Sequence, residues 1–268
     1  MQTSSTSSVS TPPVSTPSLS TRDLSIHFGG HVAVNQVSAD FYPGSLTVIV
    51  GPNGAGKTTY FNLISGQLNA SSGSVSLFGQ DITKFGAAKR TRAGIGRAFQ
   101  LTNLFPHLSV MENVRLAVQS RAGIGLNIFS LWSSHKELIQ RAEHYLERVA
   151  LANRRDDRVI TLSHGDKRKW EVAILLALEP EIMMFDEPTA GMSVDEVPVV
   201  LNLIQEVKAE KNKTILLVEH KMDVVRSLAD RIIVLHNGTL VADGEPATVM
   251  ASAIVQEAYL GKGVAQDV

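Results

Sequence analysis

The sequence predicts an α/β fold with a largely parallel central sheet, and two observations support this prediction. Short apolar runs recur along the chain, as at 46–51, 181–185 and 214–220. Segments whose apolar side chains have helical spacing lie among them, as at 57–68 and 193–211. Because buried strands that alternate with helices are typical of parallel sheets covered by helices, we expect this architecture for the core.

Further segments of the first half have recognisable local patterns. Residues 72–82 alternate between apolar and polar side chains, which predicts a strand. Ser109 and Glu112 form the Ser-x-x-Glu pattern of a capping box, so we expect a helix over 109–118. The span from about 101 to 177 is mostly helical in pattern, and this predicts a helical subdomain inserted into the α/β core.

The second half of the chain adds two helices and a hairpin. Residues 134–150 are charged and have amphipathic spacing, which predicts a helix. The helix expected over 193–211 begins with Ser193 and Glu196, a second capping pattern. Residues 231–244 form two strand-like runs joined by an Asn-Gly dipeptide, which is a strong signal for a β-hairpin.

Composition limits the class of protein. The chain has 268 residues, which suits one large domain or a core domain with a subdomain. It has no cysteine, so disulfide and thiolate chemistry are excluded, and a net charge of −1 does not indicate a nucleic-acid partner. The longest apolar run, at 173–178, is far shorter than the roughly 20 residues that cross a bilayer. We therefore expect the chain not to span a membrane, and other subunits to provide the span if it works at one.

The first 20 residues, MQTSSTSSVSTPPVSTPSLS, are nearly all serine, threonine and proline. They carry no charge and few side chains that a core could bury, so residues 1–20 are predicted to be a disordered tail. The basic start and apolar stretch of a signal peptide are both missing from this segment.

A phosphate-binding loop is predicted at GPNGAGKT, residues 51–58. This segment fits the pattern G-x-x-x-x-G-K-[ST], with a predicted strand before it and a predicted helix after it. Glycines allow backbone N–H groups to face a phosphate, and the N-terminus of the helix adds partial positive charge. Lys57 is expected to reach the β- and γ-phosphates, and the Thr58 hydroxyl is expected to ligate Mg²⁺. The alternative is a glycine-rich turn that binds nothing.

A second functional segment is predicted at IMMFDEP, residues 182–188, where a buried strand ends in two acids. Asp186 suits Mg²⁺ binding opposite the phosphate loop. Neighbouring side chains of an extended chain diverge, so Glu187 points elsewhere and suits polarisation of an attacking water. The alternative is a pair of solvated acids at the start of a helix.

The stretch TLSHGDKRKW, residues 161–170, is strongly polar and holds one glycine just before an apolar run. Ser163 and Asp166 fit a capping box, which predicts a helix start but does not explain the glycine. A helix N-terminus with a serine and a glycine backbone is also suited to an anion. A second phosphate site in one chain would make sense if it served the nucleotide of another subunit.

The motifs GPNGAGKTT, AFQ, LSHGDKRK, MMFDEPTAG and VEH occur in this order, and together they resemble the ATP-binding subunits of ATP-binding-cassette (ABC) transporters. The resemblance covers residues 21–263, which leaves 264–268 as a C-terminal tail. It implies a RecA-like P-loop NTPase core with an antiparallel β subdomain and an inserted helical subdomain. LSHGD is similar to the family's signature Leu-Ser-Gly-Gly-Gln, except that His164 and Asp166 replace glycine and glutamine.

This resemblance also implies the ligands, ATP and Mg²⁺, and a role for each motif residue. Phe28 would stack on adenine, Gln100 would be the Q-loop glutamine near Mg²⁺, and His220 would contact the γ-phosphate. The implied catalytic residues are Glu187, His220 and Gln100, and the implied Mg²⁺ ligands are Thr58, Gln100 and Asp186. The implied nucleotide contacts are Phe28, Gly51, Pro52, Asn53, Gly54, Ala55, Gly56, Lys57, Thr58, Thr59, Ser163 and Gly165.

Three segments, FGGHVAVNQVS, VEHKMDVV and VQEAYLGKG, resemble more closely the ATP-binding subunits of importers of branched-chain amino acids and of urea or short amides. In this family two cassettes meet head to tail, so that each ATP lies between one phosphate loop and the other signature. The implied partners are a second nucleotide-binding subunit, two membrane permease subunits and a periplasmic or extracellular solute-binding protein. The second subunit is expected to be a different chain, with a second copy as the alternative. The implied location is peripheral, at the cytoplasmic face of the inner or plasma membrane.

Two questions stay open at the level of sequence. The alternatives to an importer are the ATPase of a lipid or lipopolysaccharide exporter and a soluble ABC ATPase without a transport role. The apolar residues Leu104, Phe105 and Leu108 lie around Pro106. They either pack under the helical subdomain or form a groove that receives a short helix of the permease.

Overall fold

The computed structural model describes residues 16–98, 105–123, 136–253 and 255. Its larger sheet has six strands in the order β10-β9-β3-β8-β7-β6, and its smaller sheet has four in the order β2-β1-β4-β5. Strands β9, β3, β8, β7 and β6 are mutually parallel, and β10 runs antiparallel at one edge. The predicted α/β fold with a largely parallel core sheet is therefore confirmed.

The strands of the larger sheet are β3 (Leu46–Val50), β6 (Ile95–Ala98), β7 (Ile182–Asp186), β8 (Thr214–Val218), β9 (Arg231–His236) and β10 (Thr239–Gly244). Those of the smaller, antiparallel sheet are β1 (Leu19–Phe28), β2 (His31–Phe41), β4 (Ser72–Leu77) and β5 (Gln80–Asp81). The hairpin predicted over 231–244 is present as β9 and β10. The strand predicted over 72–82 is divided into β4 and β5.

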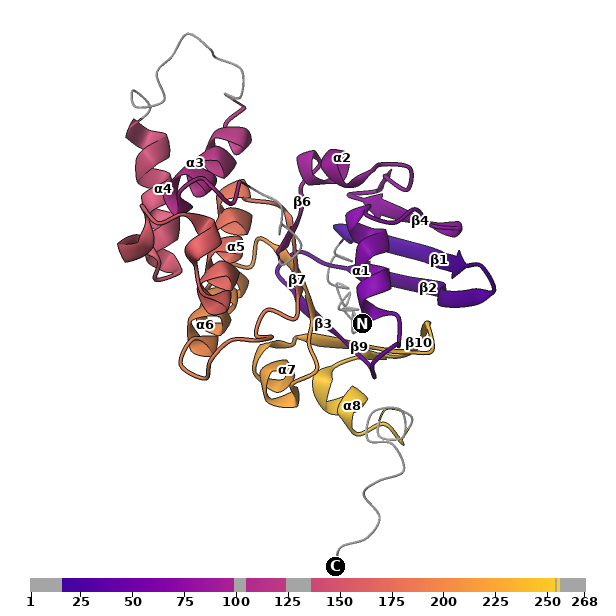
Figure 1. Ribbon diagram of the computed structural model, residues 1–268. Coiled ribbons are helices and arrows are strands. Elements are labelled where there is room, and N and C mark those ends of the chain that lie inside the picture. The colour runs from indigo at the N-terminus through magenta and orange to yellow at the C-terminus, as the bar shows by residue number, and fades with distance from the viewer. Residues whose placement is uncertain (1–15, 99–104, 124–135, 254, 256–268) are drawn as a thin grey trace, which may run out of the picture.

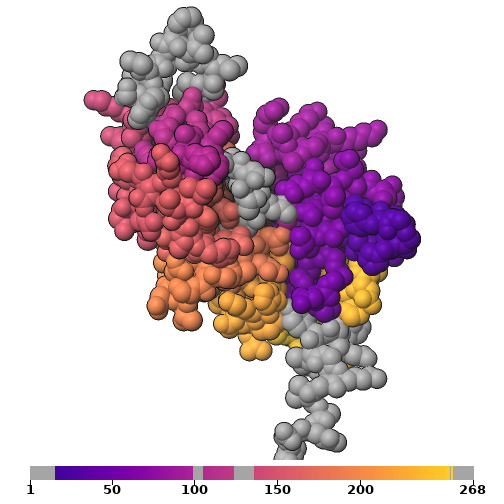
Figure 2. All heavy atoms as spheres, viewed as in Figure 1, coloured from indigo at the N-terminus to yellow at the C-terminus, as the bar shows by residue number. Residues whose placement is uncertain are grey.

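The helices cover both faces of the larger sheet (Figure 1). They are α1 (Lys57–Ser65), α2 (Ala87–Arg92), α3 (Val110–Arg121), α4 (Lys136–Arg148), α5 (His164–Leu178), α6 (Val197–Ala209), α7 (Met222–Leu228) and α8 (Pro246–Met250). Two short 3₁₀ turns, Ala152–Arg154 and Val159–Thr161, lie between α4 and α5. Helices α3, α4 and α5 pack against one another, and Figure 2 shows α3 and α4 apart from the smaller sheet and α2.

Strand alternation divides the core into two layers. In β8, Ile215 and Leu217 point to the helical layer with α3 to α7, whereas Leu216 and Val218 point to the layer with α1 and the smaller sheet. All these side chains are at most 1% exposed. Side chains of successive strand residues point to opposite faces, so a strand buried on both sides is apolar throughout. This explains the continuous apolar runs in the sequence.

Three expectations about element ends need correction. The tail expected over 1–20 is wrong at its end, because Leu19 starts β1 and the buried Ser18 hydroxyl donates to the Phe41 carbonyl at 3.1 Å. Residues 1–15 and 256–268 lie outside the described part. The helix expected from 57 ends at Ser65, where Gly66 takes a left-handed conformation (φ 77°).

The helix expected over 193–211 also begins later than predicted, at Val197. Ser193 and Glu196 do bond to each other, because the Ser193 hydroxyl donates to Glu196 Oε2 at 2.9 Å. This contact closes a turn ahead of the helix, and Pro198 then occupies the first turn, where a missing N–H costs nothing. The cap predicted at Ser109 is confirmed, because its hydroxyl accepts from the Glu112 N–H at 3.1 Å.

Candidate functional site

The phosphate loop, residues 51–58, connects β3 to α1, and at two of its glycines, Gly51 and Gly56, an added side chain would clash with backbone. Gly51 has φ 152° and Gly56 has φ 96°. A Cβ atom on Gly51 would lie 2.1 Å from the Leu235 carbonyl oxygen, and one on Gly56 would lie 2.5 Å from the Ala33 carbonyl oxygen. Both neighbours are backbone atoms of strands or strand ends, so they cannot move aside.

Lys57 is nearly buried at the start of α1. Its ammonium group donates to the carbonyl oxygens of Gly51 and Pro52, at 2.7 and 3.0 Å. Burial lowers the pKa of Lys57, while the charges of Glu187 and Asp186 oppose this shift. The loop therefore holds the Lys57 ammonium group close to the two predicted acids. A bound anion could accept its hydrogen bonds in place of the Gly51 and Pro52 carbonyl oxygens.

A hollow of about 380 Å³ lies in front of the phosphate loop. Its lining comes from the β1–β2 turn, the loop, the start of α1 and the residue after β7: Phe28, His31, Ala33, Asn53, Gly54, Ala55, Gly56, Lys57, Thr58, Thr59 and Glu187. Phe28 is 49% exposed at the rim. The hollow thus joins a positively charged helix start to an exposed aromatic ring, which suits a ligand with phosphates at one end and a flat ring at the other.

The two acids at the end of β7, Asp186 and Glu187, diverge as predicted. Asp186 Oδ2 accepts from Arg97 Nη2 at 2.6 Å, whereas Glu187 lines the hollow. Glu187 has a left-handed backbone (φ 49°), and its N–H donates to the Val218 carbonyl at 2.9 Å. His220 Nδ1 lies 3.8 Å from Glu187 Oε1, so the structure brings these two predicted catalytic residues together. Gln100 lies outside the described residues.

Arg97 is a site residue that sequence reasoning missed. It sits in β6 with its side chain 4% exposed, and it also donates to Asn62 Oδ1 at 2.7 Å and Ser65 Oγ at 3.1 Å. Burial lowers the pKa of Arg97, and the charge of Asp186 opposes the shift. The signal available in the sequence was the position of Arg97, directly before the AFQ motif. A buried arginine needs a partner such as a carboxylate.

The oxygen donors near the phosphate loop fit Mg²⁺. Thr58 supplies a hydroxyl and Asp186 a carboxylate, the hard ligands this ion prefers. No group of three or more His, Cys, Asp or Glu side chains that could hold a metal occurs among the described residues. This donor set suits an ion that completes its shell with phosphate oxygens and water rather than one caged by protein.

The signature segment, residues 163–166, starts α5. The predicted cap is confirmed, because the Ser163 hydroxyl accepts from the Asp166 N–H at 3.1 Å. Asp166 pairs with Arg154 and Lys169, both at 3.2 Å. Ser163 and Gly165 are absent from the described lining of the hollow, so one chain does not bring them to its own phosphate loop.

Of the two residues that depart from the family signature, His164 contacts the segment after β7 directly, and Asp166 is connected to it through Lys169. A Cβ atom on Gly191 would lie 2.7 Å from the His164 ring, so the imidazole covers this glycine. Lys169, already paired with Asp166, also reaches Glu196 Oε1 at 3.4 Å. The signature segment is therefore held by side chains of its own chain.

Comparisons with known proteins agree with this site. The sequence profile of the ABC transporter family matches residues 34–190. The chain is 36% identical over 244 residues to the high-affinity branched-chain amino acid transport ATP-binding protein LivG of Escherichia coli K12, covering 89% of this chain and 96% of LivG. It is 34% identical to the corresponding BraF protein of Pseudomonas aeruginosa, with the same coverage.

Solved structures give the same result. A nucleotide-free ATP-binding cassette from an ABC transporter superposes with a TM-score of 0.78 and 29% identity, covering 91% of this chain and 99% of the other. The ADP conformation of an ATP-binding cassette of an ABC transporter gives the same score and identity, covering 92% of this chain and all of the other.

Proposed function

This chain belongs to the ABC transporter family as an ATP-binding subunit with ATPase activity, and we propose that it powers the import of a small polar solute. One observation carries the proposal: three separate parts of the chain place Phe28, Lys57 and Glu187 around one hollow. The family membership agrees with the predicted P-loop NTPase fold, and the similarity to LivG and BraF disfavours the exporter and the non-transport ATPase. Branched-chain amino acids are the proposed substrates, because LivG and BraF are transport proteins for them.

We propose a division of labour within the hollow. The phosphates of ATP replace the carbonyl contacts of Lys57, so that its ammonium group offsets charge developing on the γ-phosphate. The adenine stacks on Phe28, and Glu187 accepts the proton of the attacking water. His220, 3.8 Å from Glu187, contacts the γ-phosphate. Mg²⁺, when bound by Thr58, Asp186 and Gln100, supplies charge neutralisation between the phosphates.

The second half of the ATP site is proposed to come from another subunit. Ser163 and Gly165 lie at a helix start suited to an anion, yet they do not line the hollow of their own chain. A head-to-tail pair of cassettes would bring them to the partner's nucleotide. Mixing Lys57-defective with Ser163-defective subunits tests this, where the chain pairs with itself. Recovered ATPase activity supports the shared site, and defects confined to each chain's own nucleotide contradict it.

No helix of the described residues is long and apolar enough to cross a bilayer. We propose that two permease subunits provide the path, that a solute-binding protein delivers the substrate, and that this chain docks peripherally at the cytoplasmic face. Uptake of radiolabelled leucine, urea and acetamide by the reconstituted transporter tests the substrate. Uptake of leucine alone supports the branched-chain assignment, and uptake of urea or acetamide alone contradicts it.

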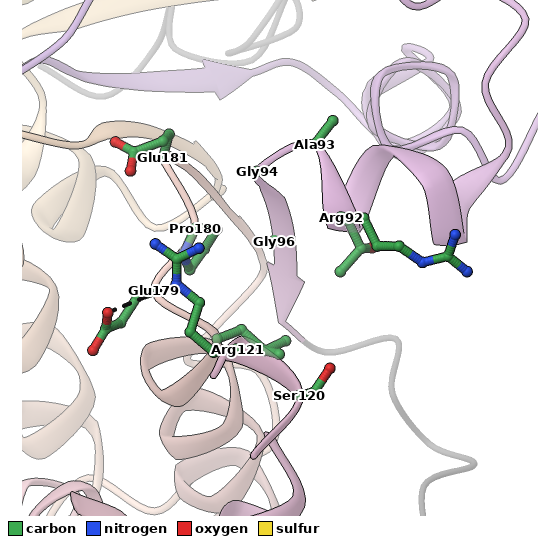
Figure 3. Close-up of a pocket in the computed structure, with 11 residues that line it drawn as sticks. Arg92, Ala93, Gly94, Gly96, Ser120, Arg121, Glu179, Pro180 and Glu181 are labelled. Carbon is green, nitrogen blue, oxygen red and sulfur yellow. Dashed lines mark ion pairs between the residues drawn. The ribbon is translucent and has the colours of Figure 1, made fainter. Parts of the chain in front are cut away.

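A groove beside α3 is the proposed permease contact. Figure 3 shows its polar end, about 260 Å³ in volume, where Arg121 of α3 pairs with Glu179 at 3.8 Å. A second hollow of about 260 Å³ shares Ser120 and Leu178 with it and contains Phe105. The groove thus has a charged and an apolar end, which suits a short amphipathic helix.

The exposure of Phe105 and Leu108, 54% and 38%, argues against packing beneath the helical layer. Ile160, which bonds through its N–H to the Pro106 carbonyl, is 52% exposed beside them. Leu104 lies outside the described residues. Phe105→Ala in the complete transporter should reduce uptake while the isolated subunit binds ATP normally. Markedly lower thermal stability of the isolated variant would instead place Phe105 in the core.

Lys57→Ala tests the ATPase assignment. The folded variant should lose most ATP binding and hydrolysis, measured by titration with a fluorescent ATP analogue and by phosphate release. Lys84→Ala, which removes an exposed lysine, is the matched control. Near-normal turnover by folded Lys57→Ala protein would rule out this site.

A further inference from the structure

Glu219 is a fully buried carboxylate directly after β8, at 0% exposure. Its Oε1 accepts from the Thr189 hydroxyl at 2.7 Å. Its Oε2 accepts from the backbone N–H groups of His220 and Lys221, at 3.0 and 3.3 Å. Thr189 is itself 1% exposed. One side chain therefore ties together two backbone segments, the one after β7 and the one after β8.

This arrangement is costly to bury. Among the described residues no cation forms an ion pair with Glu219, so hydrogen bonds alone compensate its loss of water. A carboxylate only accepts hydrogen bonds, and both of its oxygens need donors. The donors fix the side chain completely, with one oxygen facing each segment. A pair of apolar side chains would fill the same space without this cost, which points to a role in geometry rather than in packing.

The two linked segments each carry a proposed catalytic residue. Thr189 lies two residues after Glu187, and His220 follows Glu219 directly. Glu187 and His220 are partly exposed, with side chains 41% and 52% accessible, and they face each other at 3.8 Å. The Glu187 N–H also bonds to the Val218 carbonyl at 2.9 Å. The buried link thus lies underneath the exposed pair.

We propose that Glu219, held by Thr189, is a positioning residue for ATP hydrolysis that fixes His220 relative to Glu187; this inference rests on the proposed function. The phosphate loop and Phe28 supply the proposed ATP contacts other than that of His220 with the γ-phosphate, and none of the hydrogen bonds of the link reaches the loop or Phe28. Loss of the link therefore slows turnover and leaves ATP affinity intact. Small misplacements of catalytic groups reduce rates strongly, about 100-fold for roughly 1 Å in some enzymes.

Thr189→Val is the sharpest test, because valine keeps the shape and removes only the hydroxyl that donates to Glu219. In the preparation in which the wild-type chain hydrolyses ATP, kcat should fall about tenfold or more. The Kd for a fluorescent ATP analogue should stay within about twofold. Thr189→Ser, which restores the hydroxyl, should recover most of the lost rate. Thr248→Val, on the exposed side of α8, is the matched control and should leave kcat unchanged.

Glu219→Gln provides a second test, which changes the acceptor of the same hydrogen bond. Combined with Thr189→Val, it should cost less than the product of the two single effects, because both changes break one link. Where Thr189→Val folds poorly, Thr189→Ala removes the same hydroxyl without adding atoms. An unchanged kcat in the folded Thr189 variant, a parallel loss of kcat and ATP affinity, or multiplicative single effects would each overturn the inference. Absence of ATP hydrolysis by the wild-type chain in every preparation would instead overturn the proposed function.

Discussion

The phosphate loop and the signature segment are both glycine-containing helix starts suited to phosphate, but different parts of the chain hold them in place. In the phosphate loop, backbone atoms leave no room for a side chain, because a Cβ on Gly51 would meet the Leu235 carbonyl. In the signature segment, a side chain takes this place, because a Cβ on Gly165 would lie 2.2 Å from the Glu196 carboxylate. A backbone carbonyl in a sheet cannot move, whereas a carboxylate can turn away.

Their charges differ in the same way. The loop holds one nearly buried ammonium group, Lys57, against its own carbonyls. At the signature, the partly exposed side chains of Asp166, Arg154 and Glu196 form a chain of ion pairs with Lys169, which is buried. Partly exposed pairs tolerate substitution. The comparison explains why the loop keeps the common motif unchanged while the signature departs from it at His164 and Asp166.

The largest effect is expected from a substitution that removes the catalytic base and leaves the phosphate loop and the signature segment unchanged. Glu187→Gln keeps the shape of the side chain but cannot accept a proton, so ATP hydrolysis should fall about 10²- to 10⁴-fold. ATP should still bind, and the closed pair of cassettes should accumulate. Phosphate release and size-exclusion chromatography with ATP measure these outcomes, with the partner cassette present where it is required. Full hydrolysis by the variant would remove Glu187 from its proposed role.

The next effect tests the backbone constraint on the loop. Gly51→Ala should lower the free energy of unfolding by at least about 2 kcal/mol, because φ 152° disfavours a side chain and the Leu235 carbonyl blocks it. Gly54→Ala is the matched control: its φ is 80°, but no atom lies within 4 Å of the added Cβ. Its loss should be about 1–2 kcal/mol, from the backbone alone. Urea unfolding compares them, and equal losses would contradict the clash.

These contrasts also show how much could be predicted from sequence. The parallel strands β3, β7 and β8 were predictable because they are buried on both faces and have only one polar residue each. Strands β1 and β2 were missed because their pairing shifts register repeatedly, and Asp23 and Gln36 have positive φ. Such irregularities interrupt the alternation that marks a half-buried strand.

The same limit applies to the candidate site. The phosphate-loop residues around the hollow belong to a recognisable motif, because the turn requires glycine and phosphate binding favours lysine and threonine at a fixed spacing. Arg97 and Glu219 were missed because their importance comes from partners distant in sequence, Asp186 and Thr189. Only the fold brings these pairs together. The roles of all the predicted site residues, those of Gln100 and of the signature residues included, stay predictions.

A smaller effect is expected for the glycine of the signature. Gly165→Ala has no positive φ to oppose it, and the Glu196 carboxylate in its way can turn aside. Helix propensity favours alanine by about 1 kcal/mol, so the free energy of unfolding should change by less than about that amount. ATPase activity should fall nonetheless if the bare backbone approaches the partner's phosphates. A loss of stability as large as that of Gly51→Ala would erase the contrast between the two regions.

The smallest effect concerns the ion pairs of the signature region. Hydrogen bonds from the Ser193 backbone and hydroxyl lower the pKa of Glu196, and the charge of Lys169 adds to this. A lowered carboxyl pKa means that Glu196 stabilises the fold above its ordinary pKa of 4.5, and that this contribution disappears as pH falls through the lowered value. Glu196→Gln should therefore cost less than about 1 kcal/mol at pH 7, since the group is partly exposed.

At a low pH, below the lowered pKa of Glu196 in the folded chain, both folded and unfolded chains bind the proton, and Glu196→Gln and the wild type should approach equal stability. Urea unfolding at the two pH values measures this, with Glu147→Gln, an exposed glutamate of α4, as the matched control. A Glu196→Gln loss that persists unchanged at low pH would mean that packing against Gly165, rather than charge, holds the signature segment. The signature would then be constrained by shape, as the phosphate loop is, and the difference between the two regions would lie only in which atoms supply that shape.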